Sequence, residues 1–191
     1  MYRKPNGKEL TVLKRAFDKW GIFDFAKDKG LVLNDLRSNS IKEVFLLPSS
    51  LESAIHCRQP YYAGLKVGEL KKKFTPGMQG ADLIARMSKK FPYVMVNQTA
   101  ENLILYGRDV LGQSIIKTSI MLRENEIVII LNTKNEAIGI GRTKGSGESL
   151  LEHGKSTVIN LVDAGCYLRS EGDRRTYQIN TKRHAKVKYN D

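Results

Sequence analysis

The segment Glu126–Arg142, EIVIILNTKNEAIGIGR, contains two short apolar runs separated by a polar turn. Ile127–Leu131 and Ala137–Ile140 have the length of buried strands, and residues 132–136 between them are all polar. Apolar runs bounded by turn residues indicate β-strands. The segment therefore predicts two strands joined by a turn at the centre of the C-terminal half.

Further short apolar runs lie on both sides of this segment. Several short strands at intervals of about 8–12 residues are typical of a small barrel or sandwich. The additional strands are expected at Val94–Val96, Glu101–Tyr106, Ile115–Ile120 and Thr157–Val162. The C-terminal half is therefore predicted to be a mixed β-barrel.

The N-terminal half mixes helical and strand patterns. Leu13, Phe17 and Trp20 recur at helical spacing behind a possible cap at Asn6. The predicted helices are Lys8–Trp20, Leu51–Cys57 and Gln79–Lys89, and the predicted strands are Gly30–Leu33, Glu43–Leu47 and Tyr62–Val67. The first two strands flank a polar turn and should form a hairpin-like pair.

The pattern changes at Phe91-Pro92, where short strands replace the mixture of helices and strands. We expect an α+β two-domain protein, in which an N-terminal α/β sandwich-like module precedes the C-terminal mixed β-barrel. The expected boundaries are 1–93 for the first domain, 94–172 for the barrel and 173–191 for a basic flexible tail.

Positive charge is unevenly distributed along the chain. The net charge is +12 and the isoelectric point is about 9.7, which favours polyanionic partners such as RNA. Residues 1–96 hold 18 basic and 9 acidic side chains, residues 97–172 hold 8 and 9, and residues 173–191 hold 6 and 2. A barrel that binds RNA must therefore use one basic face.

The cysteines and histidines do not suggest a disulfide or a metal site. Cys57 and Cys166 are far apart, and His56, His153 and His184 lack partners at ligand spacing. The N-terminal MYRKPNGKEL lacks the apolar core of a signal peptide, and no run reaches the roughly 18 apolar residues of a membrane span. We expect a cytoplasmic protein that has no membrane-spanning segment and binds no metal ion.

Two glycine-containing segments resemble nucleotide loops only superficially. Gly139–Gly147 lacks the G-x-G-x-x-G spacing, so a strand at the barrel edge with its turn is the better interpretation. His153–Thr157 ends like a P-loop, but that motif needs a glycine where this chain has Ser149.

No group of residues predicts catalysis. His56 and Cys57 are adjacent and would point apart on a helix or strand. The carboxylate pairs lie in charged segments that read as solvated turns: Glu124 with Glu126, and Glu148 with Glu152. We therefore expect a protein that is not an enzyme and has no cofactor.

Three segments of the second half carry a family resemblance. Ala100–Leu111, AENLILYGRDVL, resembles the opening of the PUA domain in the Nip-seven family of large-subunit ribosome biogenesis factors. Ala137–Gly141 and Val162–Glu171 resemble later motifs of that domain, in the same order, and Gly64–Phe74 resembles an upstream strand that leads into a basic turn. Cys166 departs from the family, which usually has an acidic residue there, and the basic tail is longer than expected.

The resemblance implies a pre-PUA domain followed by a PUA-type barrel that binds maturing ribosomal RNA and assembly proteins without catalysis. Arg142 and Lys144 should share one side of a strand. The expected RNA-binding residues are Arg108, Lys117, Arg142, Lys144, Lys155 and Arg169, and the auxiliary ones are Lys71, Lys72, Lys73, Arg174 and Arg175. Alternatively, Arg169 pairs with Asp163 or Glu171, and Arg108 with Asp109.

The remaining candidates have structural interpretations. Gly107 and Gly165 are expected to be turn glycines. Tyr106 and Tyr167 could stack on bases, but we favour core packing because each lies in an apolar context. The lysines at 71–73 are equally compatible with a phosphate clamp and with a solvated turn.

Two other functional classes remain open. The chain could be the targeting module or accessory subunit of an RNA-modification enzyme, although residues 1–93 lack the glycine-rich turn of a cofactor-binding domain. It could also be an adaptor whose basic surface binds acidic proteins. The length suits an archaeal cytosol, whereas a eukaryotic relative would be nucleolar, and we expect a monomer.

Overall fold

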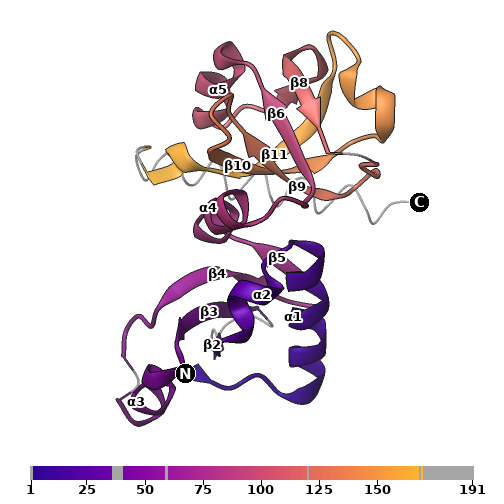
Figure 1. Ribbon diagram of the computed structural model, residues 1–191. Coiled ribbons are helices and arrows are strands. Elements are labelled where there is room, and N and C mark those ends of the chain that lie inside the picture. The colour runs from indigo at the N-terminus through magenta and orange to yellow at the C-terminus, as the bar shows by residue number, and fades with distance from the viewer. Residues whose placement is uncertain (1, 36–40, 59, 120, 168, 170–191) are drawn as a thin grey trace, which may run out of the picture. The chain divides into compact units, whose positions relative to one another are not determined.

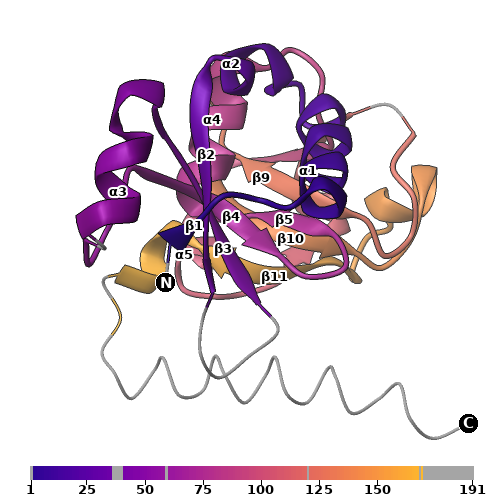
Figure 2. The same cartoon turned by 90° about the horizontal axis from the view of Figure 1, so that it is seen from below.

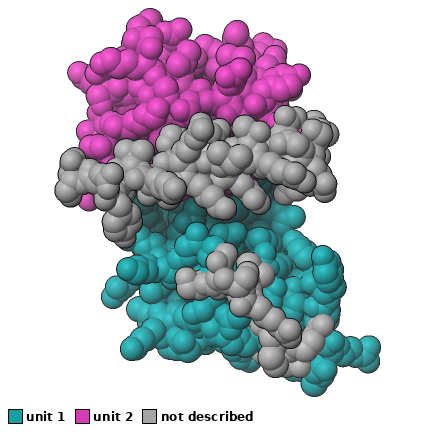
Figure 3. Space-filling view, turned by 180° about the vertical axis from the view of Figure 1, so that it is seen from behind, with its two compact units in different colours: residues 1–93, 135–137 teal, residues 94–134, 138–191 magenta. Residues whose placement is uncertain are grey.

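The computed structural model describes residues 2–35, 41–58, 60–119, 121–167 and 169. The chain divides into two compact units, which Figure 3 shows in different colours. Unit 1 contains residues 1–93 and 135–137, and unit 2 contains residues 94–134 and 138–191. Within the described ranges, no helix has the length and apolar character needed to cross a membrane. The expected turn at 37–40 and the tail with Arg174 and Arg175 lie outside the described residues.

Unit 1 is built on a five-stranded sheet with the order β1-β2-β3-β4-β5 (Figure 1). Its strands are β1 Tyr2–Arg3, β2 Lys29–Asp35, β3 Lys42–Pro48, β4 Leu65–Leu70 and β5 Phe74–Pro76. Each neighbouring pair is antiparallel, and the pairing of β2 with β3 confirms the predicted hairpin-like pair. β4 begins three residues later than expected, after Gly64, whose φ of +73° is a conformation that favours glycine.

Helices lie on both sides of this sheet, as Figure 2 shows for α3 and α1. They are α1 Gly7–Lys19, α2 Phe23–Lys27, α3 Glu52–Arg58 and α4 Met78–Met87, with a 3₁₀ turn at Ser49–Leu51. On the α3 side of the sheet, Val32 of β2 packs in a cluster that includes Ile55 of α3. On the α1 side, the Phe17 and Phe74 rings meet edge to face with centroids 5.4 Å apart. The predicted sandwich-like module is confirmed.

A buried carboxylate joins the start of α1 to the sheet. Asn6 and Glu9 form a capping box, in which each side chain accepts a hydrogen bond from the other residue's backbone N–H. Glu9 also accepts bonds from both Nη atoms of Arg3 at 2.8 Å and from Lys42 Nζ at 2.6 Å. The bonds from Arg3, followed by those from Lys42 and Asn6, lower the pKa of Glu9 to about 2.

Unit 2 is built on a six-stranded sheet with the order β7-β11-β10-β9-β6-β8. Its strands are β6 Tyr93–Val96, β7 Val110–Leu111, β8 Ile115–Thr118, β9 Ile127–Leu131, β10 Ala137–Thr143 and β11 Ser156–Asp163. β10 lies between β9 and β11, so the expectation that Gly139 and Gly141 belong to a barrel edge is wrong. A Cβ at Gly141 would stand 2.5 Å from Val158 Cγ1, which explains a glycine inside the sheet.

The prediction of a strand at Glu101–Tyr106 is also wrong, because these residues belong to helix α5, Gln98–Leu105, and its C-terminal cap. Asn97 caps the helix by accepting a hydrogen bond from the Ala100 backbone N–H at 2.9 Å. Ala100 and Ile104 are four residues apart and both buried, so the apolar run has one inward helical face.

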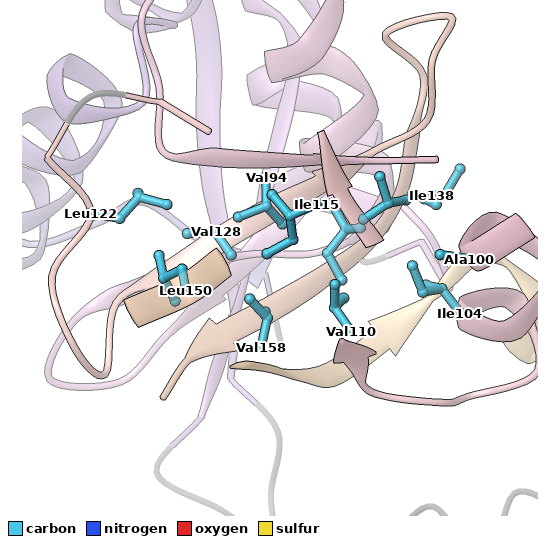
Figure 4. Close-up of a cluster of buried hydrophobic side chains, with 12 residues drawn as sticks. Val94, Ala100, Ile104, Val110, Ile115, Leu122, Val128, Ile138, Leu150 and Val158 are labelled. Carbon is cyan, nitrogen blue, oxygen red and sulfur yellow. The ribbon is translucent and has the colours of Figure 1, made fainter. Parts of the chain in front are cut away.

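The core of unit 2 gathers side chains from α5 and from most of the strands (Figure 4). Ile104 from α5, Val128 from β9 and Val158 from β11 are each at most 1% exposed. Burial of a side chain of this size contributes about 1.5–3 kcal/mol. The core therefore fixes α5 against the sheet and places the turn that follows α5 beside β11.

Candidate functional site

An open groove lies where α5 ends and β7 begins. Its volume is about 660 Å³. The groove is lined by Ala100, Leu103, Gly107, Arg108, Asp109, Leu111 and Ser114. The lining combines apolar side chains with one exposed cation, Arg108, and one carboxylate, Asp109, whose charge is paired with Lys144. Apolar surface beside a cation suits the planar faces and the phosphates of nucleotides.

The turn between α5 and β7, residues 105–109, reverses the chain at Gly107. Gly107 has a φ of +84°, and its N–H donates to the Ile104 carbonyl at 2.8 Å. Arg108 N–H donates to the Leu103 carbonyl at 3.0 Å, which completes a glycine-based helix end. The prediction that Gly107 is a turn glycine is confirmed.

Asn160 on β11 holds this turn from the sheet side. Its Nδ2 donates to the carbonyl of Ile104 at 3.0 Å and to that of Arg108 at 3.2 Å. Its backbone N–H donates to Asp109 Oδ1 at 3.0 Å. A single side chain therefore fixes both ends of the turn, which keeps Arg108 beside the groove.

Arg169 and Asp163 hold the start of the turn. The Arg169 guanidinium forms two hydrogen bonds of 2.9 Å to the fully buried Asp163 carboxylate and also donates to the Leu105 carbonyl. Of the two roles considered for Arg169, the described structure contains the internal pair. Gly165 is a close-approach glycine, because a Cβ there would stand 1.9 Å from the Leu105 carbonyl oxygen.

Lys144, which lies beside the same turn, and Lys155 both have internal partners. Lys144 Nζ donates to Ser156 Oγ at 2.7 Å and lies 3.4 Å from Asp109 Oδ2. Asp109 therefore pairs with Lys144 in the described structure. Lys155 Nζ lies 2.5 Å from Glu152, and this hydrogen bond raises the pKa of the Lys155 ammonium.

Three other predicted cations make no side-chain hydrogen bond or ion pair with the described part of the chain: Arg108, Lys117 and Arg142. Arg142 lies on β10 between the buried Gly141 and Thr143. The ladder continues past β10, because Lys144 N–H donates to the Thr157 carbonyl at 2.8 Å, so Arg142 and Lys144 lie on one side of the strand as predicted. Lys117 lies on β8, at the other edge of the sheet.

The structure thus brings Arg108, Lys144 and Arg169 together around one turn, whereas Lys155 lies beyond β7, where its carbonyl accepts from Gly112 N–H. Tyr106 is 76% exposed, so the expectation that it packs in the core is wrong. The side chain of Tyr167 lies outside the described residues. The sequence reasoning missed Asn160, whose contacts with the turn span 51 residues or more. It named Asp109 as a possible partner of Arg108, whereas the structure pairs Asp109 with Lys144.

The segments that resemble nucleotide loops have other structural roles. His153–Thr157 leads into strand β11, and Gly154 N–H donates to Gln113 Oε1 at 2.9 Å. The helix N-terminus on which a P-loop depends therefore does not follow this segment. Among the described residues, no group of three or more histidine, cysteine or acidic side chains could hold a metal ion.

A two-sided α+β module followed by a six-stranded barrel-like sheet with this groove defines a pre-PUA domain joined to a PUA domain. Two family models match accordingly: "NIP7/UPF0113, pre-PUA domain" over residues 2–78 and "UPF0113 PUA domain" over residues 92–172. The chain belongs to the NIP7/UPF0113 family, which confirms the resemblance seen in its sequence.

Archaeal relatives support this assignment. A UPF0113 protein of Archaeoglobus fulgidus is 36% identical over 172 residues, which cover 89% of this chain and 95% of the relative. A UPF0113 protein of Aeropyrum pernix is 31% identical over 138 residues, which cover 69% and 71%.

Solved structures show the same two-domain fold. A conserved PUA domain protein from Thermoplasma acidophilum aligns with a TM-score of 0.63 and 15% identity over 92% of this chain and 99% of its own. A hypothetical protein from Pyrococcus horikoshii aligns with a TM-score of 0.65 and 14% identity over the same shares.

Proposed function

We propose that this protein is a non-catalytic RNA-binding factor of large-subunit ribosome assembly. It acts in the cytoplasm as a monomer, binds pre-ribosomal RNA through the groove of its PUA domain and works with other assembly proteins. Family membership supports the process, and the groove supports the binding chemistry.

The observation that carries the proposal is the fixed turn with the unpartnered Arg108 on it. Asn160, Asp163 and Arg169 hold the turn from within, so the backbone that carries Arg108 needs little ordering when a ligand binds. Arg108 and Arg142 have no partner among the described residues and can donate to phosphates. Tyr106 offers an exposed ring on which an unpaired base can stack.

The six predicted cations then have different roles. Arg108 and Arg142 contact RNA directly, and Lys117 contributes from β8. Lys144 and Lys155 add positive potential and exchange their internal partners for phosphates. Arg169 acts chiefly by positioning the turn.

The proposal is tested by titrating a labelled pre-ribosomal RNA fragment and an unrelated RNA of equal length at several salt concentrations. Arg108→Ala with Arg142→Ala should lower the salt slope by about 1.4, since each lost contact to single-stranded RNA removes about 0.7. The matched control is Arg123→Ala with Lys134→Ala, which removes two exposed cations from turns on either side of β9. Equal slopes for the two variants would move the RNA site away from the groove.

A further inference from the structure

The ion pairs among the described residues of unit 1 use most of its acidic side chains and only part of its cations. Seven of the nine acidic residues at positions 1–93 lie within 3.8 Å of a lysine or arginine nitrogen: Glu9, Asp24, Asp35, Glu43, Glu52, Glu69 and Asp82. Their partners are Arg3, Lys4, Lys27, Lys42, Lys66 and Arg86. The excess positive charge of this unit is therefore carried by other residues.

Basic residues also lie on the outer face of α1. With 3.6 residues per turn, Lys8, Arg15 and Lys19 fall within about 40° of one another around the helix axis. They lie opposite Leu13 and Phe17, which are buried against the sheet. The outer face of α1 is therefore a cationic stripe along a helix about 20 Å long.

A second group of cations is held at the flank of this helix. Lys71, Lys72 and Lys73 form the exposed turn between β4 and β5, closed by a hydrogen bond of 3.1 Å from the Lys71 backbone N–H to the Lys73 carbonyl. The next residue, Phe74, packs its ring on Phe17 of α1. This ring contact fixes the lysine turn beside α1, although the two segments are about 50 residues apart in the sequence.

These cations are available to a ligand. Lys8, Lys14, Arg15 and the lysines at 71–73 are exposed, and their side chains have no hydrogen bond or ion pair with the described part of the chain. Asp18 is an acidic residue on the same helix and is also exposed. We call Lys8, Arg15 and Lys71–Lys73 the α1 basic face.

We propose that the α1 basic face is a second RNA-binding surface, which contacts the sugar-phosphate backbone with little regard to sequence. Lysines and exposed arginines neutralise phosphates, and contacts of this kind position a nucleic acid without reading its bases. The inference rests on the proposed function for the identification of the polyanion as RNA. It places backbone affinity on unit 1 in addition to the groove of unit 2.

The test uses the full chain and two RNAs of equal length and unrelated sequence. The variant Lys8→Ala with Arg15→Ala is compared with Lys4→Ala and Arg58→Ala, which remove the same charge from the α3 side of the sheet (Figure 2). The first variant should lower the salt slope by about 1.4 and the affinity at 0.1 M salt by about 25-fold, equally for both RNAs. Replacing all three lysines at 71–73 by alanine should lower the slope by about 2.1.

The outcomes separate this inference from the proposed function. Loss of RNA affinity in Arg108→Ala with Arg142→Ala, but equal binding by the two variants of unit 1, would overturn the α1 basic face and leave the groove as the RNA site. In that case an acidic protein would be the ligand that suits the charge of the α1 basic face. Loss in the α1 variant alone would support the second surface and count against the groove. Circular dichroism confirms that each variant is folded.

Discussion

Arg169 and Asp163 form a two-point ion pair beneath the turn after α5, with Nη1–Oδ1 and Nη2–Oδ2 distances of 2.9 Å. The carboxylate has no solvent exposure, whereas the arginine side chain is 15% exposed. Removing one partner of such a pair leaves a buried charge uncompensated, at a cost of about 3–5 kcal/mol. We expect Arg169→Ala to lower the free energy of unfolding in urea by about 3 kcal/mol. Arg108→Ala is the control, because this exposed side chain should change stability by less than about 0.5 kcal/mol.

Glu9 should make the stability of unit 1 sensitive to acid. Its pKa is about 2 in the folded chain and 4.5 ordinarily, so the carboxylate stabilises the fold above pH 4.5 and loses that contribution as the pH falls toward 2. The difference corresponds to about 3 kcal/mol. We expect Glu9→Gln to be less stable than the wild type by about this amount at pH 7.

The measurement is urea unfolding of both proteins at intervals between pH 7 and pH 2. The gap between wild type and Glu9→Gln should be constant above about pH 5 and should narrow below it. A gap that stays constant down to pH 2 would contradict the assignment of the low pKa to Glu9.

Gly165 should tolerate no side chain. An alanine Cβ would stand 1.9 Å from the Leu105 carbonyl oxygen, which belongs to backbone and cannot swing away. Overpacking of this kind costs about 1–3 kcal/mol, so Gly165→Ala should lower the midpoint of thermal unfolding. Gly7→Ala is the matched control, because nothing lies within 4 Å of its Cβ position and alanine favours a helix. A similar response in both variants would exclude close approach as the reason for Gly165.

Tyr106 should contribute to RNA binding and not to stability, since 76% of its surface is exposed. Stacking of a base on an aromatic ring contributes about 1–3 kcal/mol, so Tyr106→Ala should weaken RNA binding at least about fivefold. Tyr106→Phe keeps the ring and should bind like the wild type. Fluorescence anisotropy with a labelled RNA distinguishes the three proteins, and equal loss in both variants would point to the hydroxyl instead of the ring.

Much of the fold could be predicted from local patterns. The hairpin-like pair of β2 and β3 and the strands β9 and β11 followed from short apolar runs, and α1 followed from apolar spacing behind Asn6. The helix α5 was missed because its apolar run is as short as a strand. The signal that identifies it is Asn97, which caps the helix three residues before Ala100.

The candidate site was only partly predictable. Arg108 and Arg142 could be chosen by residue type, but the partners of Lys144 and Arg169 depend on how distant segments meet. Lys144 reaches Asp109 across 35 residues, and Arg169 reaches Leu105 across 64. The sequence therefore identifies the candidate cations, but it does not reveal which of them already bind a carboxylate or carbonyl within the fold.

The backbone of the turn after α5 is bonded inward through the carbonyls of Ile104, Leu105 and Arg108 and the N–H groups of Gly107 and Arg108. Little of its main chain is left for a ligand, so discrimination there belongs to the side chains that project from it. Such side chains can be exchanged without reshaping the loop that carries them. One or two substitutions at the surface of the turn could therefore change which ligand it prefers while the barrel beneath stays the same.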